Sequence, residues 1–170
     1  MIDWVGGLAR WLHYIAGIMW IGLLYYFNFV QAQALAEANK AGEGGPISKY
    51  VAPRALALFR AAGIGTWIMG AILLFTLSPQ HDGFVGAFTL SNGYAGIGVG
   101  AWLGTIMLFN VLVLIYPNQM KILGKVPATD EEKAKARRIA FLASRTNTML
   151  SFPMLFFMAF GFHHQGIVGL

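Results

Sequence analysis

Four apolar segments, each about long enough to cross a lipid bilayer, constrain this chain more than any other feature of its sequence. A membrane-spanning helix needs roughly 20 apolar residues, because the hydrocarbon core is about 30 Å thick. Such segments occupy residues 8–30, 55–77, 94–116 and 146–162. The 170 residues are 57% hydrophobic and 11% charged, whereas soluble domains contain about 25% charged residues. The sequence therefore predicts an all-α integral membrane protein in which residues 1–170 form a single four-span domain.

The basic residues indicate how these spans are oriented. Residues 31–60 hold four of the twelve Lys and Arg and residues 117–145 hold seven, whereas the connection 78–93 holds none. The positive-inside rule assigns the basic side to the cytoplasm. We therefore expect an up-down four-helix bundle, N-out and C-out, with cytoplasmic connections at 31–54 and 117–145. Because the charges follow the topology, the expected partner is the lipid bilayer and not nucleic acid.

The start of the chain has neither a basic n-region nor an AxA-like cleavage site. The first apolar segment is therefore expected to be a retained span and not a cleaved signal peptide.

His13 lies on the face that the first span is expected to turn toward the bundle. Residues three or four apart share a helical face, and this face holds His13, Gly17, Trp20, Leu24 and Asn28. Polar groups inside a membrane are costly and usually face protein or water. Two interpretations follow: His13 ligates a haem iron or a metal, or it is an interfacial histidine bonded to a neighbouring helix.

The other histidines lie on the same charge-poor side. His81 is interpreted as an exposed loop residue, whereas His163 and His164 follow the fourth span. An antiparallel bundle brings the end of the fourth helix level with the start of the first. One of this pair is therefore expected to face His13 as a second axial ligand, the alternative being a solvated pair near the chain end. The chain has no cysteine, which excludes covalent haem c, so a haem bound by these histidines would be haem b.

A second set of polar residues lies toward the basic side, one on each predicted span. An anion or a cofactor carboxylate is one expected ligand, with the planar guanidinium as its main donor. The alternative is hydrogen bonding between helices together with snorkelling of the arginine. The set comprises Asn28, Arg60, Asn110 and Asn147.

The third span contains glycines at four-residue spacing, namely Gly96, Gly100 and Gly104. Such a ridge usually permits close helix contact, and it also admits a flat cofactor. In the fourth span Pro153 predicts a kink.

Three stretches resemble the membrane domain of the urate oxidase N-terminal family, the bacterial membrane-bound urate hydroxylases. They are RWLHYIAGIMWIGLLYYFNF at 10–29, LGTIMLFNVLVLIYPNQMKIL at 103–123 and SRTNTMLSFPMLFFMAFGFHH at 144–164. The resemblance implies electron transfer from a substrate to a cytochrome c, which known members carry as a C-terminal domain. This chain is expected to be a short form without that domain, so its cytochrome would be a separate periplasmic chain.

The resemblance also carries functional positions and two departures. The matching positions are His13, Asn110, Asn118, Gln119, Asn147 and His163. The family often has His-Asn where this chain has Thr146-Asn147, and it tends to have a histidine where this chain has Gly98.

Two functions remain in view. The first is a redox protein of the bacterial inner membrane that binds haem b and passes electrons from a urate-like molecule to a cytochrome c. The second is a non-catalytic subunit packed in a larger respiratory or photosynthetic membrane complex or in a homo-oligomer. Catalytic residues are not assigned under either function. A transporter is disfavoured because the predicted spans contain no acidic residue.

Overall fold

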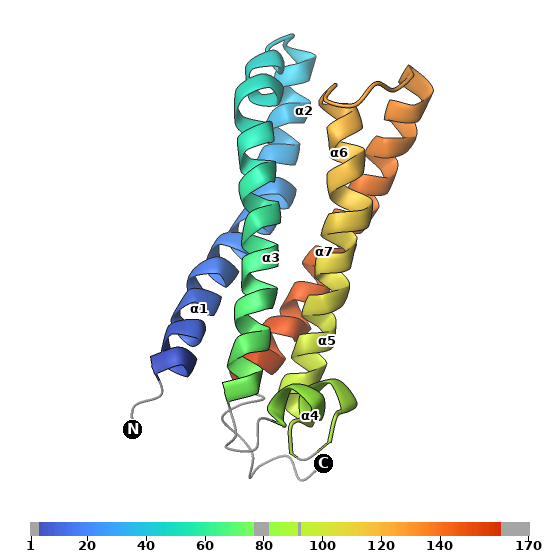
Figure 1. Cartoon of the computed structure of the whole chain (residues 1–170). Coiled ribbons are helices and arrows are strands. Elements are labelled where there is room, and N and C mark those ends of the chain that lie inside the picture. Colours follow the sequence, from blue (N-terminus) through green and yellow to red (C-terminus); the bar gives the residue numbers. More distant parts are fainter. Residues whose placement is uncertain (1–3, 77–81, 92, 161–170) are drawn as a thin grey trace.

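The computed structural model describes residues 4–76, 82–91 and 93–160, which are helical apart from short turns. These residues form five continuous helical segments (Figure 1), three of which contain a π-helical section. The segments are α1 (Trp4–Tyr25) with η1 (Tyr26–Gln31) and α2 (Ala32–Lys40), η2 (Ile47–Val51) with α3 (Ala52–Thr76), α4 (Gly83–Thr89), α5 (Ala95–Phe109) with η3 (Asn110–Ile115) and α6 (Tyr116–Ile122), and α7 (Asp130–Phe160).

The long helices pair as two hairpins. Helix α1 packs along α3, and α5 packs along α7. The two hairpins touch where α3 meets α5 and where α1 meets α7. The start of α1, the short helix α4 and the end of α7 lie at one end of the molecule, and the turns after α2 and α6 lie at the other (Figure 1). The predicted all-α class is confirmed for the described residues.

Three described helices are long and apolar enough to cross a membrane, namely 4–40, 47–76 and 95–122. They match the first three predicted spans except at residues 77 and 94, which lie just outside these ranges. The fourth predicted span, 146–162, begins in α7 and ends outside the described residues. The described part of α7 is not among the three, because a row of polar residues runs through it. That row is Ser144, Arg145, Asn147, Thr148 and Ser151.

The core lies where the four long helices meet. Helix α1 contributes Trp20 and Leu24, α3 contributes Phe59, and α5 with η3 contributes Met107 and Val111. Each of these side chains is at most 2% exposed. The apolar residues outside this core remain exposed in the isolated chain, as expected for helices whose other faces contact lipid.

Helix α4 was not predicted, because 78–93 was interpreted as a connection. Phe84 of α4 stacks on Phe75 of α3 with ring centroids 4.8 Å apart. The indole N–H of Trp102 donates to the carbonyl of Phe88 at 3.1 Å. The helix ends at Leu90, whose φ of 55° is left-handed. These contacts fasten α4 across the end of α3 and α5.

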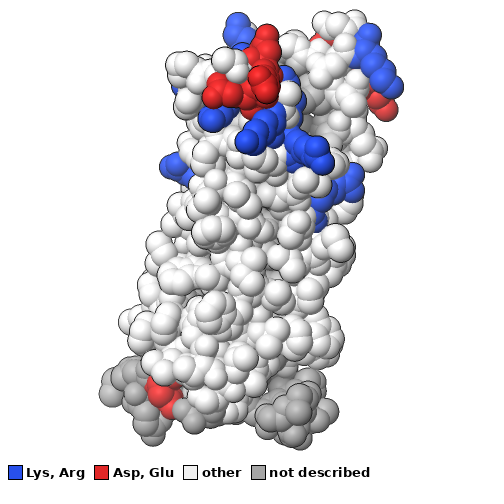
Figure 2. All heavy atoms as spheres, turned by 90° about the vertical axis from the view of Figure 1, so that its right-hand side faces the viewer, with Lys and Arg blue, Asp and Glu red and all other residues white. Residues whose placement is uncertain are grey.

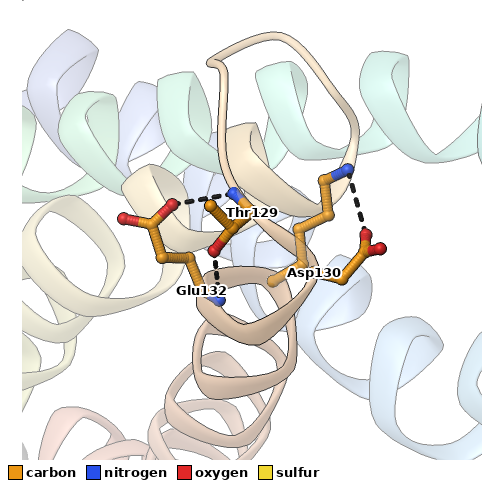
Figure 3. Close-up of polar contacts among 4 residues, drawn as sticks. Thr129, Asp130 and Glu132 are labelled. Atoms are coloured by element: carbon orange, nitrogen blue, oxygen red, sulfur yellow. Dashed lines mark hydrogen bonds and ion pairs between the residues drawn. The ribbon is translucent and has the colours of Figure 1, made fainter.

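The start of α7 is fixed by a reciprocal capping box (Figure 3). The backbone N–H of Glu132 donates to the Thr129 hydroxyl at 3.2 Å, and the Glu132 carboxylate accepts the N–H of Thr129 at 2.8 Å. Asp130 also pairs with Lys133 at 3.7 Å. Accepting the Thr129 N–H lowers the pKa of Glu132 from its ordinary value. Two N–H groups at the helix start that have no partner within the helix are thereby satisfied.

Candidate functional site

His13 is held between α1 and α3 by one hydrogen bond. Its Nδ1 lies 2.8 Å from the backbone carbonyl oxygen of Thr66. A carbonyl oxygen only accepts, so Nδ1 is the donor and carries the hydrogen. In a neutral imidazole Nε2 is then the atom with the free lone pair. Nε2 has no hydrogen-bond partner within the described part of the chain. This bond to α3 is what the interpretation of His13 as an interfacial histidine predicts. A histidine that ligates a haem would make the same kind of bond.

The ring of His13 occupies the space that a glycine leaves open. A Cβ atom placed on Gly70 would lie 2.9 Å from Cε1 and 3.0 Å from Nδ1 of His13. About one helical turn further along α1, Gly17 faces Thr66. About two turns along, Trp20 would lie 3.0 Å from a Cβ placed on Gly63. The predicted inward face of α1 is therefore confirmed, and glycines of α3 receive its two large rings. The sequence did not identify Thr66 or Gly70 as partners of His13.

The predicted counterparts of His13 lie outside the described residues. His163 and His164 both fall there, so the pairing of His13 with a second axial ligand stays a prediction. His81, interpreted as an exposed loop residue, also lies outside the described residues. Within the described residues no group of three or more His, Cys, Asp or Glu is placed to hold a metal ion. A haem does not require such a group, because one or two axial side chains suffice.

The polar layer on the basic side is tied together mainly through α7. The Nδ2 of Asn110 donates to Oδ1 of Asn147 at 2.8 Å, and Nδ2 of Asn147 donates to the carbonyl of Met107 at 2.9 Å. Asn147 is fully buried. These two asparagines, predicted as part of one layer, are therefore in direct contact. Their amide groups satisfy each other and the backbone of α5.

Asn28 is bonded to α7 one helical turn away. Its Nδ2 donates to the hydroxyl of Ser144 at 2.8 Å and to the carbonyl of Leu24 at 2.9 Å. Asn28 lies within η1 and Asn110 begins η3. Such π-helical turns are frequent at functional sites, and here they accompany the two asparagines that bind α7.

A further contact extends this network toward the other end of α7. The hydroxyl of Ser151 donates to the carbonyl of Thr148 at 2.7 Å. Tyr25 Oη lies 2.9 Å from Ser151 Oγ, and since Ser151 has one hydroxyl hydrogen, Tyr25 is the donor in that contact. Sequence reasoning missed Ser144, Ser151 and Tyr25. The spacing of Ser144, Asn147 and Ser151, which places all three on one helical face, was the available signal.

Arg60 lies apart from the asparagines. Its guanidinium carbon is 4.3 Å from the ring centroid of Tyr116 in α6, and the side chain is exposed. Among the described residues Arg60 makes no hydrogen bond and no ion pair. The structure therefore brings Asn110 and Asn147 together, ties Asn28 to the same helix, and leaves Arg60 at the surface.

Glycines of α5 lie close to other helices. A Cβ on Gly100 would lie 3.3 Å from Phe157 and Met158 of α7, whereas one on Gly104 would meet nothing within 4 Å. A Cβ on Gly98 would overlap the carbonyl oxygen of Ala87 in α4. Backbone does not yield as a flexible side chain does, so Gly98 has no room for a histidine. The histidine that the resemblance suggested for this position would overlap α4 as it packs here.

Comparison with known proteins relates the second half of the chain to a known family. No curated protein and no solved structure matches the chain. The family described as urate oxidase N-terminal matches residues 82–167, half of the chain. The match includes α4 to α7 with Asn110 and Asn147, whereas His13 and Arg60 precede it. The chain belongs to the urate oxidase N-terminal family.

Proposed function

We propose that this chain is an integral membrane redox protein that binds haem b through His13. It passes electrons from a urate-like small molecule to a separate cytochrome c in the periplasm. The observation that carries the proposal is the bond from Nδ1 of His13 to the Thr66 carbonyl. A ligating histidine commonly donates its other ring N–H to a carbonyl or carboxylate, which fixes its tautomer and orientation.

The residues around His13 suit a haem ligand. The hydrogen bond and Gly70 fix the ring, so Nε2 would approach an iron with little loss of side-chain freedom. When bound, a haem supplies an iron that accepts and releases single electrons. His163 or His164 is proposed as the second ligand, because the described end of α7 lies at the same end of the molecule as the start of α1 (Figure 1).

The proposed orientation places this site toward the outside of the bacterial inner membrane. The Lys and Arg residues gather at the opposite end of the molecule (Figure 2), which the positive-inside rule assigns to the cytoplasm. The chain would then be a four-span bundle with both termini outside. Electrons leaving the site toward a periplasmic cytochrome would have a short path.

A second function is favoured by a different observation. Position 98, where the resemblance suggests a histidine, holds a glycine, and α4 leaves no room there for a side chain. The side chains of Asn110 and Asn147 are also hydrogen-bonded to each other. A relative that has lost part of its site would serve as a non-catalytic subunit packed against other membrane chains or against copies of itself.

The visible spectrum of the purified protein, oxidised and then reduced with dithionite, distinguishes the two functions. A reducible Soret band is expected for the redox protein and should be lost or shifted in His13→Ala. Added imidazole should restore part of it by filling the vacated space. His163→Ala and His164→Ala should identify the second ligand, because only one of them should alter the band.

Leu24→Ala provides the matched control. Leu24 is fully buried on the same helix, and its truncation costs about 2–5 kcal/mol without touching a ligand. It should lower stability and leave the band unchanged. An unaltered reduced spectrum in His13→Ala would reject His13 as the ligand. A featureless wild-type spectrum, with other chains tightly co-purified, would support the accessory subunit.

A further inference from the structure

One end of the molecule carries a large surplus of positive charge. Residues 31–60 and 117–145 hold eleven of the twelve Lys and Arg but only five Asp and Glu. Figure 2 shows this basic surface as a belt, with acidic groups mostly beyond it at the tip. Within the described residues, Lys133 and Asp130 form an ion pair at this end. The belt is therefore not neutralised by the protein itself.

Arg60 and Arg145 are the deepest cations of this belt. Arg60 follows Arg54 by six residues on α3, and Arg145 follows Arg138 by seven on α7. At 1.5 Å per residue each lies about 9–10 Å nearer the middle of the molecule than the preceding arginine. Both side chains are exposed. They therefore stand where the basic end gives way to the apolar helix surface.

Each of these arginines rests on an aromatic ring. The guanidinium carbon of Arg60 is 4.3 Å from the centroid of Tyr116, and that of Arg145 is 5.1 Å from the centroid of Phe141. Stacking uses the face of the guanidinium and leaves its N–H edge free. Neither arginine donates a hydrogen bond to a described residue. The guanidinium groups of Arg60 and Arg145 therefore keep N–H donors available where the basic end meets the apolar helix surface.

We propose that this belt binds the phosphate groups of acidic phospholipids, with Arg60 and Arg145 as its deepest contacts. A phosphate accepts two N–H bonds from one guanidinium, which matches the free edge. Acidic lipids of the cytoplasmic leaflet attract juxtamembrane Lys and Arg. The proposal depends on the membrane orientation proposed above and does not depend on haem.

A small-molecule anion fits these residues less well than a lipid. Asn110 and Asn147, its expected further ligands, are buried and bonded to each other. Arg60 is exposed and stacked on Tyr116, so it faces outward and not into a site shared with them. A headgroup at the surface reaches Arg60 without disturbing the asparagines.

The test measures which lipids surround the full chain in nanodiscs made from equal amounts of phosphatidylglycerol and phosphatidylcholine. Electron paramagnetic resonance of spin-labelled lipids reports those in contact with the protein. Wild type should enrich phosphatidylglycerol by at least about threefold at its surface. The pair Arg60→Gln with Arg145→Gln should lower that enrichment to about half or less. Free inorganic phosphate should not displace the lipid, because the surface binds a headgroup anchored in the bilayer.

Three comparisons make the result decisive. Arg10→Gln, which removes the one basic residue at the other end, should leave the enrichment unchanged. Arg60→Lys with Arg145→Lys should give an enrichment between those of the wild type and the glutamine pair, since the charge is kept but the two-point contact is lost. Should the glutamine pair not fold, salt added to wild type decides, because screening must abolish a phosphate contact of this kind. No enrichment in wild type, enrichment that withstands salt, or full enrichment in the glutamine pair would overturn the proposal. The haem spectrum is a separate measurement, so either proposal can fail alone.

Discussion

The two hairpins of this protein use their polar groups in opposite ways. Between α1 and α3 the contact is made by large rings set against glycines, with one hydrogen bond from His13. Trp20, also in this contact, has a buried indole N–H without a partner among the described residues. Between α5 and α7 the buried amides bond to each other and to backbone.

This difference supports the proposal that the ligand binds at the α1–α3 hairpin. The α5–α7 pair consumes its polar groups in fastening helices, as polar residues often do within membranes. The α1–α3 pair leaves the Nε2 lone pair of His13 and the N–H of Trp20 without described partners. The family match covers the second hairpin and with it Asn110 and Asn147.

The largest effect is expected from Asn147→Ala in the α5–α7 hairpin. The change leaves Nδ2 of Asn110 and the carbonyl of Met107 without this side-chain partner. We expect a loss of about 2–3 kcal/mol in the free energy of unfolding, measured by SDS titration of the protein in detergent micelles. Thr146→Ala, an exposed neighbour, should change it by less than about 0.5 kcal/mol. Equal effects of the two substitutions would mean that the network does not fasten this hairpin.

A comparable test in the α1–α3 hairpin is Gly70→Ala. The new methyl group would displace the His13 ring, at a cost of about 1–3 kcal/mol for overpacking. The Soret band should shift as well, because the bond that orients the ring is broken.

Gly22→Ala is the control for that change, since a Cβ there meets nothing within 4 Å. It should be neutral or slightly stabilising, because alanine restricts the unfolded chain. If both glycine variants keep the wild-type stability and spectrum, the α1–α3 contact tolerates movement of His13 and the contrast between the hairpins is weaker than proposed.

The contact between the hairpins should be weaker than either. A double-mutant cycle with Asn28→Ala and Ser144→Ala isolates the bond that joins η1 and α7. Hydrogen bonds between membrane helices average about 0.6 kcal/mol in such cycles, and we expect a coupling of that size. A coupling as large as the effect of Asn147→Ala would make the hairpins one unit instead of two.

The sequence predicted the faces of helices better than their partners. Spacing alone placed His13 and Trp20 on the buried side of α1, and the depth of Asn110 and Asn147 brought them into one layer. The carbonyl of Thr66 and the space at Gly70 were not predictable, because the register between two helices is set by tertiary packing and not by local pattern. Helix α4 was missed for a related reason. It is short, and contacts with Phe75 and Trp102, which are distant in sequence, hold it in place.

Arg60 shows the limit of reasoning from depth. Arg60 lies at the same predicted depth in its span as the asparagines do in theirs. Depth, however, does not determine the direction in which a side chain leaves its helix. The face toward α6 places it over Tyr116 at the surface. Depth can be read from chain length, whereas the direction of a long side chain depends on the neighbours that surround it.

The smallest effect is expected where α7 begins, outside the packed part of both hairpins. The pKa of Glu132 is lowered because its carboxylate accepts the N–H of Thr129. A lowered pKa means that the folded state favours the ionised form of Glu132, so this carboxylate stabilises the fold at neutral pH. That stabilisation is lost as the pH falls below about 4.5, the ordinary pKa, and through the lower pKa of the folded state. Glu132→Gln keeps an acceptor at this position but cannot titrate. Thermal unfolding of both proteins between about pH 6 and pH 3 should show the wild type losing slightly more stability than the variant toward acid. Since the other carboxylates are common to both proteins, a constant difference across that range would show that the capping box does not depend on the charge of Glu132.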